Sequence, residues 1–194
     1  MKQDKLASLI SLVSNAPVIA FFSFLTLLLF PIYAAFPLFL LIAALFGTVI
    51  PLTTIYYLYK KKHINDFYSS DRASRWLAFL LVTPSYFVGA FLLLLLNAPE
   101  IVSILMLCYV ANSIVAALIT LKWKISVHLI GLAGPVTILA ANFGSYAWLL
   151  LLFALPIGWS RIRLKMHNTP QVVAGVAVGI ALTAIQLFVY LSVL

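Results

Sequence analysis

The chain has 194 residues, of which 65% are hydrophobic and only 8% are charged, with a formal net charge of +8. About a quarter of the residues in soluble globular proteins are charged, so this composition excludes an ordinary soluble domain. Because the apolar runs are continuous and rich in leucine, without the alternation of a membrane barrel, we expect an all-α polytopic membrane bundle. Residues 1–194 are interpreted as one integral membrane domain.

The first predicted element is residues 1–16, whose amphipathic pattern indicates a short interfacial helix. A bilayer core about 30 Å thick requires about 20 apolar residues per helix, and apolar segments of about this length follow along the whole chain. There are seven candidates, at 17–34, 36–59, 76–96, 101–121, 125–142, 146–159 and 170–193. Since the first two are barely separated and the sixth is short, the sequence leaves six or seven spans open.

The loops between these segments concentrate the basic residues on one face. With seven spans, the amino terminus and the loops at 60–75, 122–124 and 160–169 share one side of the membrane, and they contain all 12 Lys and Arg residues. The positive-inside rule predicts that this side is cytoplasmic, and we expect the membrane to be the plasma membrane. However, His63, His128 and His167 share the same side, and topology signals do not require histidine. A functional site at this face is therefore a second interpretation.

The loop before the last apolar segment reads "WSRIRLKMHNTPQVVAG". Ser160 and Arg161 are followed by five residues and then His167, just ahead of a helix that Thr169 and Pro170 are suited to begin. This stretch resembles the third signature of the type 2 phosphatidic acid phosphatase superfamily, which is S-R, five residues, H, three residues, D. The first three residues match at the family's spacing.

Two earlier segments resemble the other signatures of that family. In "KWKISVH", Ser126 and His128 keep the serine and histidine of the P-S-G-H signature. In "KKKHINDFYSSDRASRW" the basic residues of the first signature are present, including Arg72 and Arg75, but their spacing differs. The resemblance covers residues 60–180.

The resemblance implies a metal-independent lipid phosphatase that works through a phosphohistidine and needs no cofactor. It implies that His167 is the nucleophile and His128 the general acid. It assigns phosphate binding to Arg161, Lys124, Arg72 and Arg75, since guanidinium and ammonium groups complement phosphate oxygens. Ser126 joins them because backbone N–H groups at the start of its helix can bind an anion. The substrate class is a lipid phosphate or diphosphate monoester, such as phosphatidate, phosphatidylglycerol phosphate or a polyprenyl diphosphate, and no nucleic-acid partner is expected.

Gln171 occupies the position of the family's aspartate, which orients the nucleophilic histidine. A glutamine carbonyl can orient an imidazole but adds no charge. Either Asp66 or Asp71 takes over this role, or both carboxylates are ion-pair partners of Arg72 and Arg75. The alternative function is therefore a catalytically weakened relative that binds or handles anionic lipids.

A transporter or channel subunit is a third hypothesis, but no charged residue lies near the middle of any predicted span, where ion pathways usually have one. Asn112 lies within the predicted span 101–121 and belongs to none of the family motifs. We expect it to form a hydrogen bond to a neighbouring helix. The sequence does not indicate the oligomeric state.

Overall fold

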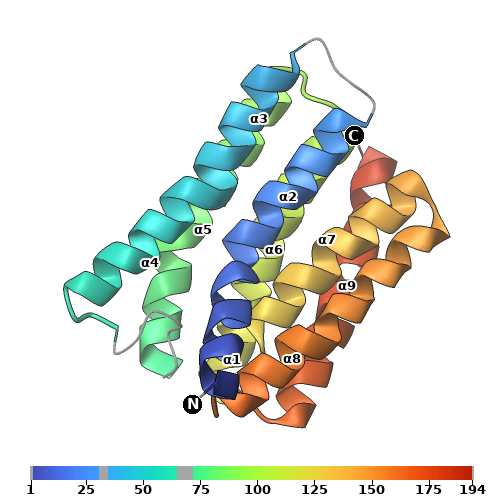
Figure 1. Ribbon diagram of the computed structural model, residues 1–194. Coiled ribbons are helices and arrows are strands. Elements are labelled where there is room, and N and C mark those ends of the chain that lie inside the picture. Colours follow the sequence, from blue (N-terminus) through green and yellow to red (C-terminus); the bar gives the residue numbers. More distant parts are fainter. Residues whose placement is uncertain (1, 31–34, 65–71, 194) are drawn as a thin grey trace.

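The computed structural model describes residues 2–30, 35–64 and 72–193, which form a bundle of roughly aligned helices (Figure 1). Within these ranges the regular elements are all helical and no strand occurs, which confirms the all-α prediction. The helices are α1 (Lys2–Val13), α2 (Ala16–Leu29), α3 (Phe36–Ala44), η1 (Leu45–Val49), α4 (Ile50–Lys60), α5 (Arg72–Leu95), α6 (Glu100–Lys122), α7 (Val127–Phe143), η2 (Ser145–Phe153), α8 (Ala154–Arg163) and α9 (Thr169–Val193).

Five helices of the described chain are long and apolar enough to cross a bilayer. Two of them are composite, because α3, η1 and α4 form one helix over Phe36–Lys60, and η2 and α8 form another over Ser145–Arg163. The other three are α5, α6 and α9. The pair α1 and α2, bent by 52°, adds a sixth span if it crosses as one unit, and α7 is apolar but shorter, with 17 residues. The expected all-α membrane bundle is therefore confirmed, with five or six candidate spans among the described residues where the sequence left six or seven open.

The centre of the bundle is α7, in which every residue from His128 to Ala140 is buried. Its neighbour α9 approaches closely because glycines face it: a Cβ on Gly175 would lie 2.7 Å from the Ser126 carbonyl oxygen, and one on Gly179 2.8 Å from Ala133 Cβ. Helices pack closely in membranes where small residues line the interface. This packing places the start of α7 against the start of α9.

Asn112 joins α6 to α9. Its Nδ2 donates to Thr183 Oγ1 at 3.0 Å, and its Oδ1 accepts from Gln186 Nε2 at 2.8 Å. Since water is absent from a bilayer core, polar side chains there need partners within the protein. The predicted interhelical role of Asn112 is confirmed.

One end of the bundle collects the beginnings of α1, α5, α7 and α9 and the ends of α4, α6 and α8 (Figure 1). The segments that carry the histidines and the basic residues therefore lie at the same end, as the loop count predicted. The helix expected at residues 1–16 is α1, which packs against α8 and is tied to it by a 3.1 Å ion pair between Asp4 and Arg163. Its interfacial position stays a prediction.

Candidate functional site

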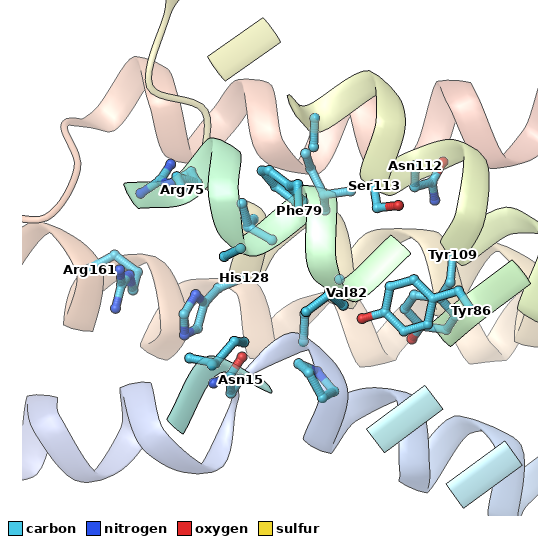
Figure 2. Close-up of a pocket in the computed structure, with 18 of the residues that line it drawn as sticks. Asn15, Arg75, Phe79, Val82, Tyr86, Tyr109, Asn112, Ser113, His128 and Arg161 are labelled. Atoms are coloured by element: carbon cyan, nitrogen blue, oxygen red, sulfur yellow. The ribbon is translucent and has the colours of Figure 1, made fainter. Parts of the chain in front are cut away.

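A cavity of about 110 Å³ extends into the bundle from this end (Figure 2). Its walls include four buried basic side chains, Arg75, His128, Arg161 and His167. Figure 2 shows Arg75, Arg161 and His128 at one end of the cavity, and Tyr86, Tyr109 and Asn112 at the other. The cavity thus has a cationic end and a mostly uncharged interior.

Four separate segments supply the cationic end. Arg75 lies in the first turn of α5, His128 is the second residue of α7, and Arg161 lies in the last turn of α8. His167 lies in the turn between α8 and α9. The pairing of His128 with His167 and Arg161, which the sequence suggested from two distant motifs, therefore corresponds to one cavity in the structure.

The ring of His167 is held from its Nδ1 side. Nδ1 lies 3.0 Å from Gln171 Oε1 and 3.2 Å from the Lys124 carbonyl oxygen. Both partners are acceptors, so Nδ1 carries the hydrogen and donates it, and the lone pair resides on Nε2. An imidazole in this tautomer offers Nε2 as a nucleophile or base.

Gln171 is itself held in place by Asn168. The Asn168 backbone N–H donates to Gln171 Oε1 at 3.3 Å, and the Gln171 backbone N–H donates to Asn168 Oδ1 at 3.1 Å. This reciprocal pair at the start of α9 resembles a capping box. It turns the amide oxygen of Gln171 toward the ring of His167. Gln171 therefore contacts this ring as the family's aspartate is expected to do, but through an uncharged oxygen.

The surroundings of His167 favour its neutral form. Burial, followed by the nearby Arg75 and Arg161 guanidinium groups, lowers the pKa of His167 to about 3, although the Gln171 hydrogen bond opposes this change. Charge is costly in a buried environment, and like charges nearby increase that cost. At neutral pH, Nε2 therefore keeps its lone pair, while the space around it is electrically positive.

Ser11 of α1 connects two of the site residues, a role that the sequence interpretation missed. His128 Nε2 donates to the Ser11 carbonyl oxygen at 3.1 Å, and Arg161 Nη1 donates to Ser11 Oγ. Ala7, Ser11 and Ser14 are all buried and recur at the spacing of one helix face. This small-residue stripe was the signal in the sequence that α1 packs against another helix beside the site.

Of the other predicted phosphate ligands, Arg75 lines the cavity, whereas Ser126 and Lys124 do not. Ser126 is the N-cap of α7 and fully buried, and its Oγ has no hydrogen-bond partner among the described residues. Lys124 is half-buried and contributes its carbonyl oxygen to His167, whereas the residues lining the cavity include neither Lys124 nor Ser126. Arg75 donates from Nη1 to the Ile125 carbonyl oxygen at 2.8 Å. Its guanidinium therefore braces the segment that leads into α7.

Three predicted residues cannot be placed around the cavity. Arg72 begins α5, but its side chain lies outside the described part of the structure, and Asp66 lies outside the described residues altogether, as does Asp71. Among the residues that are described, no three His, Cys, Asp or Glu side chains gather closely enough to hold a metal ion.

Comparison with known proteins yields no match: neither a protein-family model, nor a curated protein, nor a solved structure is similar to this chain. The resemblance to lipid phosphatases therefore rests on the motif residues of the sequence alone.

Proposed function

We propose that the protein is a membrane lipid phosphatase that hydrolyses a phosphate or diphosphate monoester of a lipid through a phosphohistidine intermediate. The observation that carries the proposal is the convergence of His128, Arg161 and His167, from two separate family-like motifs, with Arg75 on a single buried cavity. The cavity lies at the end of a bundle of apolar helices, where a lipid phosphate at the membrane surface is within reach.

The charge of the cavity suits a phosphoryl group. Enzymatic phosphoryl transfer depends largely on positioning and on the stabilisation of charge spread over the phosphoryl oxygens. Arg75 and Arg161 are 4% and 1% exposed, so both guanidinium groups are fixed in an environment that screens charge poorly. Two such groups beside a neutral imidazole bind an anion and leave the nucleophile unprotonated.

The proposed reaction has two steps. In the first, the Nε2 lone pair of His167 forms a bond to phosphorus, and the bond between phosphorus and the lipid oxygen breaks. That oxygen takes the electron pair together with a proton from His128, which is an imidazolium ion when the phosphate dianion is bound and becomes neutral in this step. In the second, water attacks phosphorus and gives a proton back to His128. The bond between Nε2 and phosphorus then breaks, and its electron pair returns to Nε2.

Gln171 sets an expectation for the rate. Its amide oxygen fixes the tautomer of His167, but it supplies no negative charge to stabilise the cationic phosphohistidine. In a serine-protease triad, replacing the orienting aspartate by asparagine costs about 10⁴ in rate, partly because the tautomer changes. Since Gln171 keeps His167 in the correct tautomer, we expect a slow enzyme whose loss of rate, relative to one with an aspartate at this position, is smaller than about 10⁴.

The second candidate function is a lipid-binding protein without turnover, and the neutral Gln171 is the observation that favours it. Such a protein retains the cationic end of the cavity as a site for the headgroup of an anionic lipid. An assay of phosphate release distinguishes the two candidate functions, because only a phosphatase releases phosphate.

The test is phosphate release by detergent-purified protein in the presence of chelator, from phosphatidate, phosphatidylglycerol phosphate and a polyprenyl diphosphate. We expect release from at least one substrate, and its loss in His167→Asn and His128→Asn. His63→Asn is the matched control, because His63 is exposed at the same end of the bundle and does not line the cavity. Equal activity in His167→Asn and the wild type would exclude the proposed mechanism. No release by folded wild-type protein would favour the lipid-binding candidate.

We also propose that the end of the bundle with the cavity faces the cytoplasm and that the membrane is the plasma membrane. The positive-inside rule supports this orientation, because all 12 basic residues belong to segments on that side. Cysteines introduced at Lys61 and at Tyr146 report on opposite ends of the bundle, and both positions are exposed. In intact cells, an impermeant thiol reagent should label only the cysteine at position 146, and labelling of only the cysteine at position 61 would reverse the orientation.

A further inference from the structure

The cavity has room for a phosphate group but not for a lipid chain. Its volume is about 110 Å³, whereas a dry cavity of about 150 Å³ in a protein core accommodates one benzene. If the phosphate of a lipid occupies the cationic end, its hydrocarbon chain must leave the cavity between two helices.

Two apolar spaces adjoin the cavity, and each shares one residue with it. The α2–α4 crevice, of about 600 Å³, is lined by Leu12, Val18, Phe22, Leu52 and Tyr56, and it shares Asn15 with the cavity. The α5–α6 groove, of about 230 Å³, shares Phe79 with the cavity. These are the two candidate routes for the chain.

The shared residues favour the α2–α4 crevice. Asn15 lies at the bend between α1 and α2, where it is the N-cap of α2 but makes no cap hydrogen bond with its side chain. Its carboxamide is thus available to the oxygen that links a phosphate to its chain. At the other junction, the ring of Phe79 is bulky and has no polar group. Figure 2 shows Asn15 near the His128 ring, at the cationic end of the cavity.

The walls of the α2–α4 crevice suit a hydrocarbon chain. Thr53 faces the crevice, but its hydroxyl donates to the Val49 carbonyl oxygen of its own helix at 2.8 Å. Thr48 Oγ1 donates to the Pro17 carbonyl oxygen at 2.8 Å and ties η1 to the start of α2. From there toward the site end of the bundle, α4 runs apart from α1 (Figure 1). Phe22 and Tyr56 in the walls of the crevice are 60% and 55% exposed, so the crevice opens to the outside of the bundle.

From these features, we infer that the α2–α4 crevice holds the hydrocarbon chain of the lipid phosphate while its phosphate lies against Arg75 and Arg161, with Asn15 at the junction. This inference rests on the proposed function and narrows its substrate class. The lipid carries a terminal phosphate monoester, because the cavity has no volume for a further headgroup beyond the phosphate.

The first test uses a long-chain alkyl phosphate with a photoreactive diazirine in its chain, and the same chain ending in an alcohol. With purified protein in lipid nanodiscs, we expect the phosphate probe to label peptides containing residues 12–22 and 52–56. The alcohol probe should label them at least fivefold less, and excess inorganic phosphate should reduce labelling by the phosphate probe. Equal labelling by both probes, or labelling centred on residues 79–83 and 114–118, would overturn the inference.

The labelling result does not depend on catalysis. If the wild type releases no phosphate but the phosphate probe labels the crevice, the hydrolytic proposal fails and the crevice assignment stands. If phosphate is released but labelling is centred on the α5–α6 groove, the crevice assignment fails alone.

The second test blocks each route with one bulky residue. Thr53→Trp fills the α2–α4 crevice, and Ile114→Trp fills the α5–α6 groove as the matched control, since both positions are exposed on the bundle surface. We expect Thr53→Trp to raise KM at least tenfold for the long-chain substrate while KM for propyl phosphate stays within twofold. A large effect of Ile114→Trp and none of Thr53→Trp would assign the chain to the other route.

Discussion

Lowering the pH from 7 to 5 should destabilise the protein by about 2 kcal/mol through His167 alone. An unfolded histidine has a pKa of about 6.5, whereas the pKa of His167 in the folded protein is about 3. Between these values the unfolded state binds a proton that the folded state does not, so stability rises with pH. The contribution is fully present above the unfolded pKa and is lost as the pH falls below it.

The magnitude follows from the two pKa values. At pH 5 the unfolded chain gains RT ln(1 + 10^1.5), or about 2 kcal/mol, from protonation at this position, and the folded protein gains almost nothing. Because His167 is only 7% exposed, little solvent is present to reduce the difference. Over the same pH change, the free energy of unfolding of His167→Asn should fall by about 2 kcal/mol less than that of the wild type.

The assay is the free energy of unfolding in mixed micelles, measured by denaturing-detergent titration at pH 7 and pH 5. The wild type, His167→Asn and His63→Asn are compared, because His63 is exposed and controls for the removal of any histidine. The reasoning is refuted if His167→Asn loses as much stability on acidification as the wild type does, or if His63→Asn alone abolishes the dependence.

Three further predictions concern single positions. Gln171→Asp, which places a carboxylate at the 3.0 Å contact with His167, should raise turnover at least tenfold in the phosphate-release assay, and a decrease would show that the amide is preferred. Tyr109→Phe removes a buried hydroxyl with no partner among the described residues, so we expect unfolding titrations to show a gain of about 1 kcal/mol, and a loss would reveal an interaction of that hydroxyl. Gly179→Val should destabilise by about 1–3 kcal/mol or more because the new side chain meets Ala133, whereas Ala177→Val, at an exposed position of α9, should change unfolding little, and equal effects would contradict the close packing of α7 and α9.

The helices could be predicted from the sequence because their signal is local. Runs of about 20 apolar residues can satisfy their backbone in lipid only as helices, and counting the loops placed the histidines and arginines at one end. The bounds of α7 were also predictable, since the expected segment 125–142 corresponds to Val127–Phe143, but its central place in the bundle was not. Every residue from His128 to Ala140 is buried among other helices, and this packing depends on which helices surround α7.

The site was partly predictable. His128, Arg161 and His167 belong to motifs whose spacing is visible in the chain, and the cavity brings them together with Arg75. Ser11 and Asn15 were missed because their roles depend on how α1 folds back against α8 and bends into α2. The contacts of Ser11 join it to His128 and Arg161, more than a hundred positions away. The small-residue stripe indicates that α1 packs against another helix, but it does not specify which one.

The most direct test of a phosphohistidine mechanism is to look for the covalent intermediate. Protein mixed in chelator with a substrate that it hydrolyses, labelled with radioactive phosphate, is quenched in alkaline detergent within one turnover, and its peptides are mapped. We expect base-stable, acid-labile phosphate on the peptide that contains His167, and none in His167→Asn. Phosphate release at the wild-type rate by His167→Asn, without a labelled peptide in either protein, would contradict the proposed role of His167.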